Sequence, residues 1–298
     1  MISFIVCTYN REKYIYECLS RLAANTEQDG WEIILVNNNS TDQTAEECKR
    51  FEQNYPKVDY HYFVEKQQGL SFARNRGIAE AHGEWLVFLD DDAMVEKDYI
   101  SNLLANISSN INASAFGGRI EPLFEDGRPD WYSKWAMGFV SAIDLGDEDI
   151  EFPANKYPIG ANMGIRRAVL DEVGVFNTDL GRTGDNLLGG EEKDIFNRIR
   201  QAGHTICYFP NIGVRHCIPA RRTTEEFIAR LANGVGVSER LRTRRIGALA
   251  YGKRLFLELV KWGGTIVLWC MYALAGHKPK GDILVLFRYN LSKGLFGV

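Results

Sequence analysis

The sequence has 298 residues, of which 45% are hydrophobic and 25% charged, with a formal net charge of −4. A chain of this length can bury a large core, as one α/β domain or as a domain with an appendage. Its six cysteines are scattered and form no CxxC pair, which argues against a disulfide framework or a zinc cluster and favours a reducing cytoplasm.

The first 120 residues alternate between apolar strands and helices. Continuous apolar strands separated by helices of about 10–15 residues indicate a mostly parallel sheet that is covered on both faces. In such sheets, ligands bind beyond the carboxyl ends of the strands. The predicted strands are residues 2–8, 31–37, 60–64 and 84–89, and the predicted helices are 13–25, 41–55 and 71–81.

Beyond residue 120 this alternation fades. An aromatic-rich, loop-like segment comes first, then a strand followed by a helix, then a loop that opens another helix, and finally a mostly helical stretch. These segments are residues 121–135, 159–174, 189–203 and 222–262. A single catalytic domain with a C-terminal extension is the simplest division.

Three consecutive carboxylates, Asp90, Asp91 and Asp92, follow the apolar run 85–89. Burying an unpaired charge is costly, so a positive group is expected among them. Hard divalent cations prefer oxygen ligands, and an Asp-x-Asp at a strand end presents two carboxylates on one side. The alternative is a helix N-cap cluster, because Asp is favoured in a first turn.

Four motifs occur in one order: VCTYNRE at 6–12, LVNNNSTDQT at 35–44, GLSFARNRGIAEAHGEWLVFLDDDA at 69–93 and GGEEKD at 189–194. Together they resemble the family 2 nucleotide-sugar glycosyltransferases over about residues 2–240. The resemblance implies an α/β, GT-A (Rossmann-like) fold with a mostly parallel central sheet flanked by helices. It also implies an inverting transferase that needs a divalent cation, Mn²⁺ or Mg²⁺.

The turns after the first two strands hold the nucleoside in this family. Thr8, Tyr9 and Arg11 match the first turn. The second turn usually reads Val-Asp-Asp-Gly-Ser, with a carboxylate that accepts the N3–H of uracil, whereas this chain has Asn37, Asn38 and Asn39 there. An Asn amide can accept N3–H and donate to a base carbonyl, so a UDP-sugar is favoured while the base stays open. A turn capped by Ser40 or Asp42 is compatible with either reading.

The resemblance also assigns roles around the three aspartates. Arg74 would hold the nucleotide, Asp90 or Asp91 the ribose, and Asp92 the metal. His216, in GVRHC, matches a position that often adds a metal contact, and Asp90 is a further candidate ligand. Without the resemblance, Arg74 would be interpreted as a surface helix charge and His216 as a structural histidine.

The loop GGEEKD carries the predicted catalytic base. An inverting transferase needs a carboxylate that deprotonates the acceptor hydroxyl. The family usually has Glu-Asp here with Asp as the base, so Glu192 takes that place after Glu191. Glu191 and Asp194 are the neighbouring candidates. The alternative is an acidic helix start that favours the helix dipole.

Trp131 and Trp135 lie in the irregular segment RPDWYSKW. Aromatic rings can pack against the C–H faces of sugars, so the two residues are candidates for an acceptor platform. Core aromatics are the alternative.

The charge of the chain is uneven. Residues 215–298 contain 15 Lys and Arg against 5 Asp and Glu, so 1–214 contain 35 − 15 = 20 against 39 − 5 = 34. The uninterrupted apolar run 263–276 is about 14 residues, short of the roughly 20 that span a bilayer. An interfacial helix on an anionic membrane surface is therefore expected, with packing on the domain or at a dimer interface as the alternative. Nucleic acid fits this apolar segment less well.

The predicted protein is a glycosyltransferase that moves a sugar from a nucleoside diphosphate-sugar to a hydroxyl of a glycan or lipid-linked oligosaccharide, in bacterial surface polysaccharide synthesis. Residues 1–120 would bind the nucleotide, 121–240 the acceptor, and 241–298 form a basic, hydrophobic helical tail. The location would be cytoplasmic, peripheral on the inner membrane. The alternatives are a catalytically degenerate partner subunit and, less favoured because CTYNRE has no glycine, a sugar nucleotidyltransferase.

Overall fold

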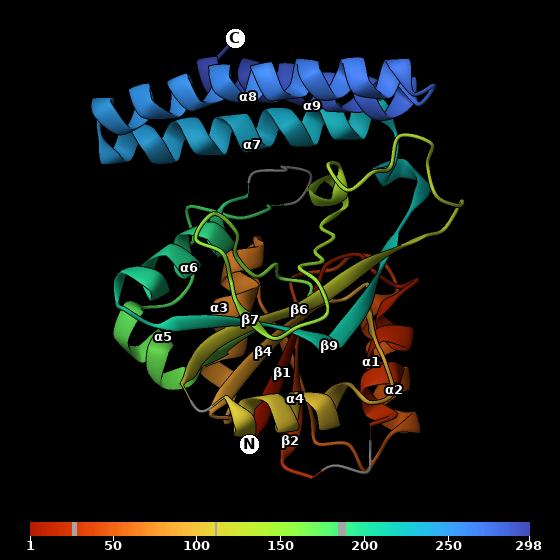
Figure 1. Ribbon diagram of the computed structural model, residues 1–298. Coiled ribbons are helices and arrows are strands. Elements are labelled where there is room, and N and C mark those ends of the chain that lie inside the picture. Colours follow the sequence, from red (N-terminus) through yellow and green to blue (C-terminus); the bar gives the residue numbers. More distant parts are fainter. Residues whose placement is uncertain (26–28, 111, 184–188) are drawn as a thin grey trace. The chain divides into compact units, whose positions relative to one another are not determined.

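The computed structural model of the chain describes all residues except 26–28, 111 and 184–188 (Figure 1). The chain forms two compact units. The sheet unit comprises Met1–Leu123, Ala142–Asp179 and Glu191–Cys217, and the helical unit comprises Phe124–Ser141, Leu180–Gly190 and Ile218–Val298.

The sheet unit is built on strands in the order β3-β2-β1-β4-β8-β6-β9-β5, with β7 paired to β9. Strand β1 runs parallel between β2 and β4, so that Thr8 lies opposite Asn37 and Cys7 lies opposite Asp90. The carboxyl ends of these strands therefore meet at one edge, as the sequence predicted. The parallel strands are β1 (Ile2–Thr8), β2 (Trp31–Asn37), β3 (Tyr60–Val64) and β4 (Trp85–Asp90).

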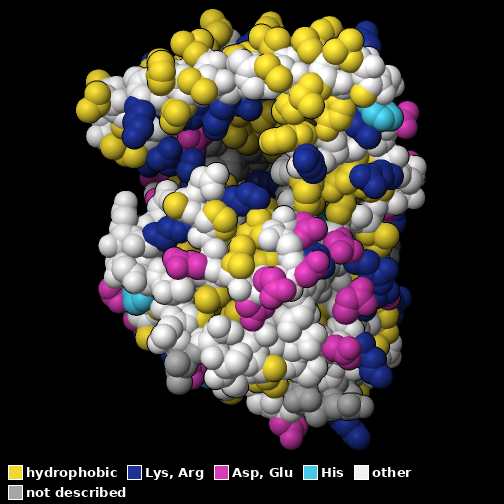
Figure 2. Space-filling view, viewed as in Figure 1, with side chains coloured by type: hydrophobic (Ala, Val, Ile, Leu, Met, Phe, Trp, Pro, Cys, Tyr) yellow, Lys and Arg dark blue, Asp and Glu magenta, His cyan; other side chains and the backbone are white. Residues whose placement is uncertain are grey.

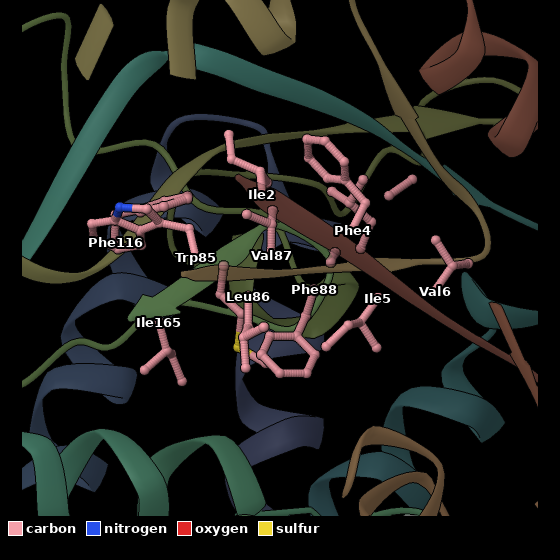
Figure 3. Close-up of a cluster of buried hydrophobic side chains, with 14 of the residues drawn as sticks. Ile2, Phe4, Ile5, Val6, Trp85, Leu86, Val87, Phe88, Phe116 and Ile165 are labelled. Atoms are coloured by element: carbon pink, nitrogen blue, oxygen red, sulfur yellow. The ribbon is translucent and has the colours of Figure 1, made fainter. Parts of the chain in front are cut away.

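The apolar runs of these strands are buried on both faces. Phe4 and Ile5 are neighbours in β1, point to opposite faces of the sheet in Figure 3, and are 0% and 1% exposed. Since alternate side chains of a strand point to opposite faces, only a sheet covered on both sides can bury such a run completely.

Three helices connect the parallel strands, namely α1 (Ile15–Ala23), α2 (Thr44–Asn54) and α3 (Leu70–Glu80). Their existence was predicted, but α2 begins at Thr44 rather than at Thr41. The carboxylate of Asp42 accepts the backbone N–H of Thr44 at 3.0 Å, which holds the preceding residues in a turn.

The other half of the sheet is antiparallel. Sequence analysis predicted β8 (Met163–Arg166) followed by α5 (Arg167–Val173) and the helix α6 (Glu191–Gln201). It missed β6 (Ala113–Phe124) and β9 (Thr205–Ile218), because glycine, proline and charged residues interrupt their apolar pattern. The remaining elements are β5 (Ala93–Val95), α4 (Tyr99–Ser109) and β7 (Ile150–Glu151).

The helical unit contains three long helices, α7 (Glu225–Ile246), α8 (Ala248–Leu274) and α9 (Lys278–Phe296). The predicted boundary after residue 240 falls within α7. Helices α7 and α9 approach closely at Gly236, where a methyl group would overlap the carbonyl oxygen of Leu291. Short 3₁₀ turns occur at Met137–Val140 and Ala220–Arg222. By length and composition, α8 is apolar enough to cross a membrane.

The two candidate acceptor tryptophans differ in exposure. Trp131 is buried in the helical unit and its indole N–H donates to the carbonyl of Thr223 at 3.0 Å, whereas Trp135 is 53% exposed. Trp131 is therefore a packed residue that leaves little ring surface free, and Trp135 offers an open ring.

Candidate active site

The acidic cluster begins at the last residue of β4 and ends just before β5. Possible ligand atoms of Asp90, Asp92 and His216 all lie within 4.8 Å of one another. The pairing of β5 with β9 sets Ala93 opposite His216, which brings the imidazole Nε2 to 2.9 Å from Asp92 Oδ1. Because a strand and not a helix follows the aspartates, the helix-cap alternative is wrong.

These three side chains fit a hard divalent cation. Two carboxylates supply the oxygen ligands that such cations prefer, and an imidazole nitrogen is a further possible ligand. Asp92 and His216 are 3% and 1% exposed, so water competes weakly for their ligand atoms. The predicted metal residues are thus brought together, although they come from distant parts of the chain.

Asp91 points to a different partner. Its Oδ1 lies 3.1 Å from Arg11 Nε, and Arg11 Nη2 lies 3.7 Å from Asp92 Oδ2. Burial raises the pKa of Asp91 to about 7, while the positive charge of Arg11 acts in the opposite direction. The sequence predicted a positive group among the aspartates, and Arg11 is one such group.

Arg74 is the second such group, and the interpretation of this residue as a surface charge is wrong. It is 2% exposed on α3. Its Nη1 lies 3.1 Å from Glu191 Oε1, and its Nη2 lies 3.3 Å from Glu192 Oε1 and 3.9 Å from Asp90 Oδ1. One guanidinium thus connects the acidic cluster with both glutamates of the GGEEKD motif, which lie in the first turn of α6.

Glu192 is held from a second side by Gly160, whose backbone N–H donates to Oε1 at 2.8 Å. Burial, with the nearby charge of Glu191, raises the pKa of Glu192 to about 7, and Arg74 opposes this shift. A carboxylate with a pKa near neutrality is suited to general-base work. Gly160 was not predicted as a site residue, since an isolated glycine in an irregular segment carries no signal of its own.

The other two base candidates lie in different surroundings. Glu191 Oε1 faces Arg74, and its buried Oε2 has no hydrogen-bond partner among the described residues. Asp194 pairs with Arg198 at 3.0 Å, and Arg198 in turn donates to the carbonyls of Gly174 and Val175. Arg198 therefore fastens α6 to the segment that follows α5, and Asp194 pairs with it within the helix.

The predicted nucleoside turns lie at the same strand ends. Thr8 is buried, while Tyr9 is 37% exposed and has an accessible ring. The amide of Asn38 donates to the carbonyls of Glu65 and Gln67 at 3.0 and 2.8 Å and accepts the N–H of Gly69 at 2.8 Å. The Asn38 amide therefore makes its hydrogen bonds to the loop before α3. A contact of Asn38 with a nucleotide base stays a prediction.

The family model "Glycosyl transferase family 2" matches residues 3–174. The glucosyl-dolichyl phosphate glucuronosyltransferase of Haloferax volcanii is 28% identical over 80% of this chain and 76% of its own length.

Solved structures share the fold. The mannosyltransferase PcManGT from Pyrobaculum calidifontis, in complex with GDP-Man and Mn²⁺, has a TM-score of 0.63 at 18% identity, over 99% of this chain and 87% of its own. S. aureus TarS 1–349, in complex with UDP-GlcNAc, has a TM-score of 0.55 at 21% identity; this chain covers 66% of it with 78% of its own length. The predicted GT-A fold is confirmed, and with the family model matching over more than half of its residues, the chain belongs to glycosyl transferase family 2.

Proposed function

We propose that this glycosyltransferase moves a sugar, with inversion, from a nucleoside diphosphate-sugar to a hydroxyl of a glycan or lipid-linked oligosaccharide in bacterial surface polysaccharide synthesis. One observation carries the proposal. The guanidinium of Arg74 lies within 3.9 Å of Asp90, in the candidate metal cluster, and 3.3 Å from Glu192, the candidate base. The candidate metal cluster and the candidate base therefore belong to one charge network around the buried Arg74.

Glu192 is the proposed base. Its carboxylate takes the proton of the acceptor hydroxyl while the hydroxyl oxygen forms a bond to the anomeric carbon. The bond from that carbon to the diphosphate oxygen breaks, and its electron pair leaves with the nucleoside diphosphate. General-base help of this kind contributes about 10²–10⁴-fold to the rate. Gly160 and Arg74 orient Oε1 of Glu192 by a hydrogen bond and an ion pair.

Asp90, Asp92 and His216 would hold a divalent cation, Mn²⁺ or Mg²⁺, and such an ion offsets the negative charge on a departing diphosphate. Their carboxylate and imidazole donors support this assignment. PcManGT, which shares the fold, was solved in complex with GDP-Man and Mn²⁺.

The nucleotide would lie over the ends of β1, β2 and β4, in residues 1–120, and the acceptor would be held within 121–240. Tyr9 offers an exposed ring for stacking on the base, and Arg11 fixes Asp91 beside the ribose position. Thr8 and Asn38 shape the same turns, and a UDP-sugar is the favoured donor. Trp135 is the better exposed acceptor candidate, and Trp131 would contribute through packing.

The proposed location is cytoplasmic, peripheral on a membrane that carries the acceptor, with residues 241–298 as the membrane-associating tail. The supporting features are the positive charge of residues 215–298 and the long apolar helix α8.

A panel of nucleotide sugars with Mn²⁺ tests the enzymatic proposal through release of the nucleoside diphosphate. Turnover of one donor, abolished by EDTA and restored by Mn²⁺, is the expected result. Binding of nucleoside diphosphates by calorimetry without turnover of any donor would instead indicate the degenerate partner subunit.

A further inference from the structure

Helix α8 buries polar side chains and exposes apolar ones. The residues that it buries in the helical unit are Arg254, Glu258 and Thr265. A surface helix of a soluble domain buries apolar side chains and exposes charged ones. In α8 the buried positions are polar, so the solvent-facing side needs its own explanation.

The buried charges of α8 are fully engaged by its neighbours. Glu258 is 1% exposed and its oxygens lie 2.8 Å from Arg254 Nη1 and 3.1 Å from Arg288 Nη1 of α9. Arg254 Nε also lies 3.2 Å from Glu239 of α7. Breaking a buried ion pair by removing one partner is strongly destabilising. The network therefore fixes the rotation of α8 and keeps its opposite face outward.

That opposite face is an apolar stripe along the helix. Its members are spaced three, four or seven residues apart, as residues on one side of a helix are. Figure 2 shows hydrophobic side chains gathered over the long helices of the helical unit. The stripe contains Phe256 (65% exposed), Val260 (57%), Val267 (59%), Met271 (60%) and Leu274 (91%). An exposed apolar surface of this extent marks a contact site.

We propose that this face of α8 lies in the surface of an anionic phospholipid bilayer, parallel to its plane. The proposal deepens the peripheral location proposed above and rests on it. Exposed basic residues occur just before, along and just after the helix, where lipid headgroups would meet them. They are Arg244, Arg245, Lys253, Lys261 and Lys278.

An in-plane arrangement suits α8 better than a crossing one. Its N-terminal half carries Lys253 and Lys261 on the exposed side, and a crossing helix would place them in hydrocarbon. The segment 262–276 has no Asp, Glu, Lys or Arg and is shorter than the roughly 20 residues that span a bilayer. Lysine side chains of an in-plane helix can reach the headgroups while the stripe enters the acyl boundary.

Cys270 allows a direct test, because it is the exposed one of the six cysteines and lies in α8. The full chain, labelled there with an environment-sensitive fluorophore, is mixed with vesicles of phosphatidylcholine with or without phosphatidylglycerol. We expect a blue shift on the anionic vesicles that added salt reduces. No shift on either vesicle overturns the proposal, as does a stable dimer in which Cys270 resists labelling.

A matched pair of double variants tests whether vesicle binding depends on the exposed face of α8 or on exposed apolar side chains anywhere on the protein. The double variant Val260→Ser/Val267→Ser should partition onto anionic vesicles at least about 10-fold more weakly. The control Leu123→Ser/Val175→Ser removes apolar side chains that are 42% and 44% exposed in the sheet unit, and should bind like the parent chain. Equal binding by the α8 variant contradicts the proposal.

The nucleotide-sugar panel keeps the two proposals distinguishable. If Val260→Ser/Val267→Ser releases nucleoside diphosphate at the parent rate but loses vesicle binding, both proposals stand. If the parent chain turns over a nucleotide sugar but never binds vesicles, the proposed membrane contact of α8 is wrong and the proposed transferase activity stands.

Discussion

The backbone N–H of Gly160 donates to Glu192 Oε1 at 2.8 Å, while Arg74 approaches the same oxygen at 3.3 Å. A residue of an irregular segment thereby orients the proposed catalytic base. A methyl group on Gly160 would overlap Arg74 Nη2 and crowd Glu192 Oε1, so the ends of both side chains would have to shift.

Replacing Gly160 with alanine should therefore displace Glu192 without touching the nucleoside turns. We expect kcat to fall at least about 10²-fold, and because Arg74 shifts together with Glu192, the nucleoside diphosphate affinity measured by calorimetry should fall as well. Gly138→Ala is the control, because a methyl group there meets no atom within 4 Å. A fully active Gly160→Ala enzyme would show that the position of Glu192 does not matter.

Glu192→Gln keeps the size of the side chain but removes the proton acceptor. We expect kcat to fall at least about 10²-fold with donor binding nearly intact, since the donor is held elsewhere. Asp194→Asn should cost much less, because Asp194 pairs with Arg198. Glu192→Asp tests whether the longer side chain is matched to the acceptor. If Glu192→Gln works normally while Glu191→Gln or Asp194→Asn is inactive, the base has to be reassigned.

The pH dependence of the reaction follows from the raised pKa of Glu192, about 7. Below that pH the carboxyl is protonated and cannot accept the proton of the acceptor, so kcat should fall as the pH drops below about 7. An ordinary glutamate would keep the rate constant down to about pH 4.5. Rates between pH 5 and 9 at saturating donor measure this limb. A rate that stays flat down to about pH 5 would exclude Glu192 as the group that titrates.

The metal prediction concerns Asp92, which is 3% exposed beside His216. Asp92→Asn should lose most of the turnover and weaken nucleoside diphosphate binding in Mn²⁺, because an amide is a poorer ligand for a hard cation. The control is Asp42→Asn, whose carboxylate binds backbone N–H groups of Glu12 and Thr44 and should affect mainly local stability. Undiminished activity of the parent chain in EDTA would refute the metal role.

Local sequence determined much of the sheet unit and of its active edge. Runs such as 85–89 are apolar at every position, and this pattern requires a strand that is covered on both faces. The same run leads into Asp90-Asp91-Asp92, and alternation predicted that Asp90 and Asp92 share a side. Their ligand atoms do lie within 4.8 Å of each other, although Asp91 and Asp92 form a turn after β4 and not an extended segment. The four motifs, in their order, indicated the family.

Tertiary structure alone decided which distant side chains complete the site. His216 reaches Asp92 because β9 pairs with β5, and β9 lacks the regular apolar pattern that would reveal it as a strand. Arg74 links Asp90 to Glu192 because the fold brings α3 close to the first residues of α6, and the backbone N–H of Gly160 reaches the same carboxylate. Such contacts depend on how distant segments pack, and the periodicity of a short segment carries no information about that.

Helix α8 shows the same division between sequence and tertiary structure. Its composition revealed an apolar segment with basic flanks, but the amino-acid pattern is compatible with either face turned inward. The ion pairs of Arg254 with Glu239 of α7 and of Glu258 with Arg288 of α9 hold the charged face of α8 inward, because buried charges need partners. The apolar face of α8 is exposed because the opposite, charged face is held by ion pairs with α7 and α9.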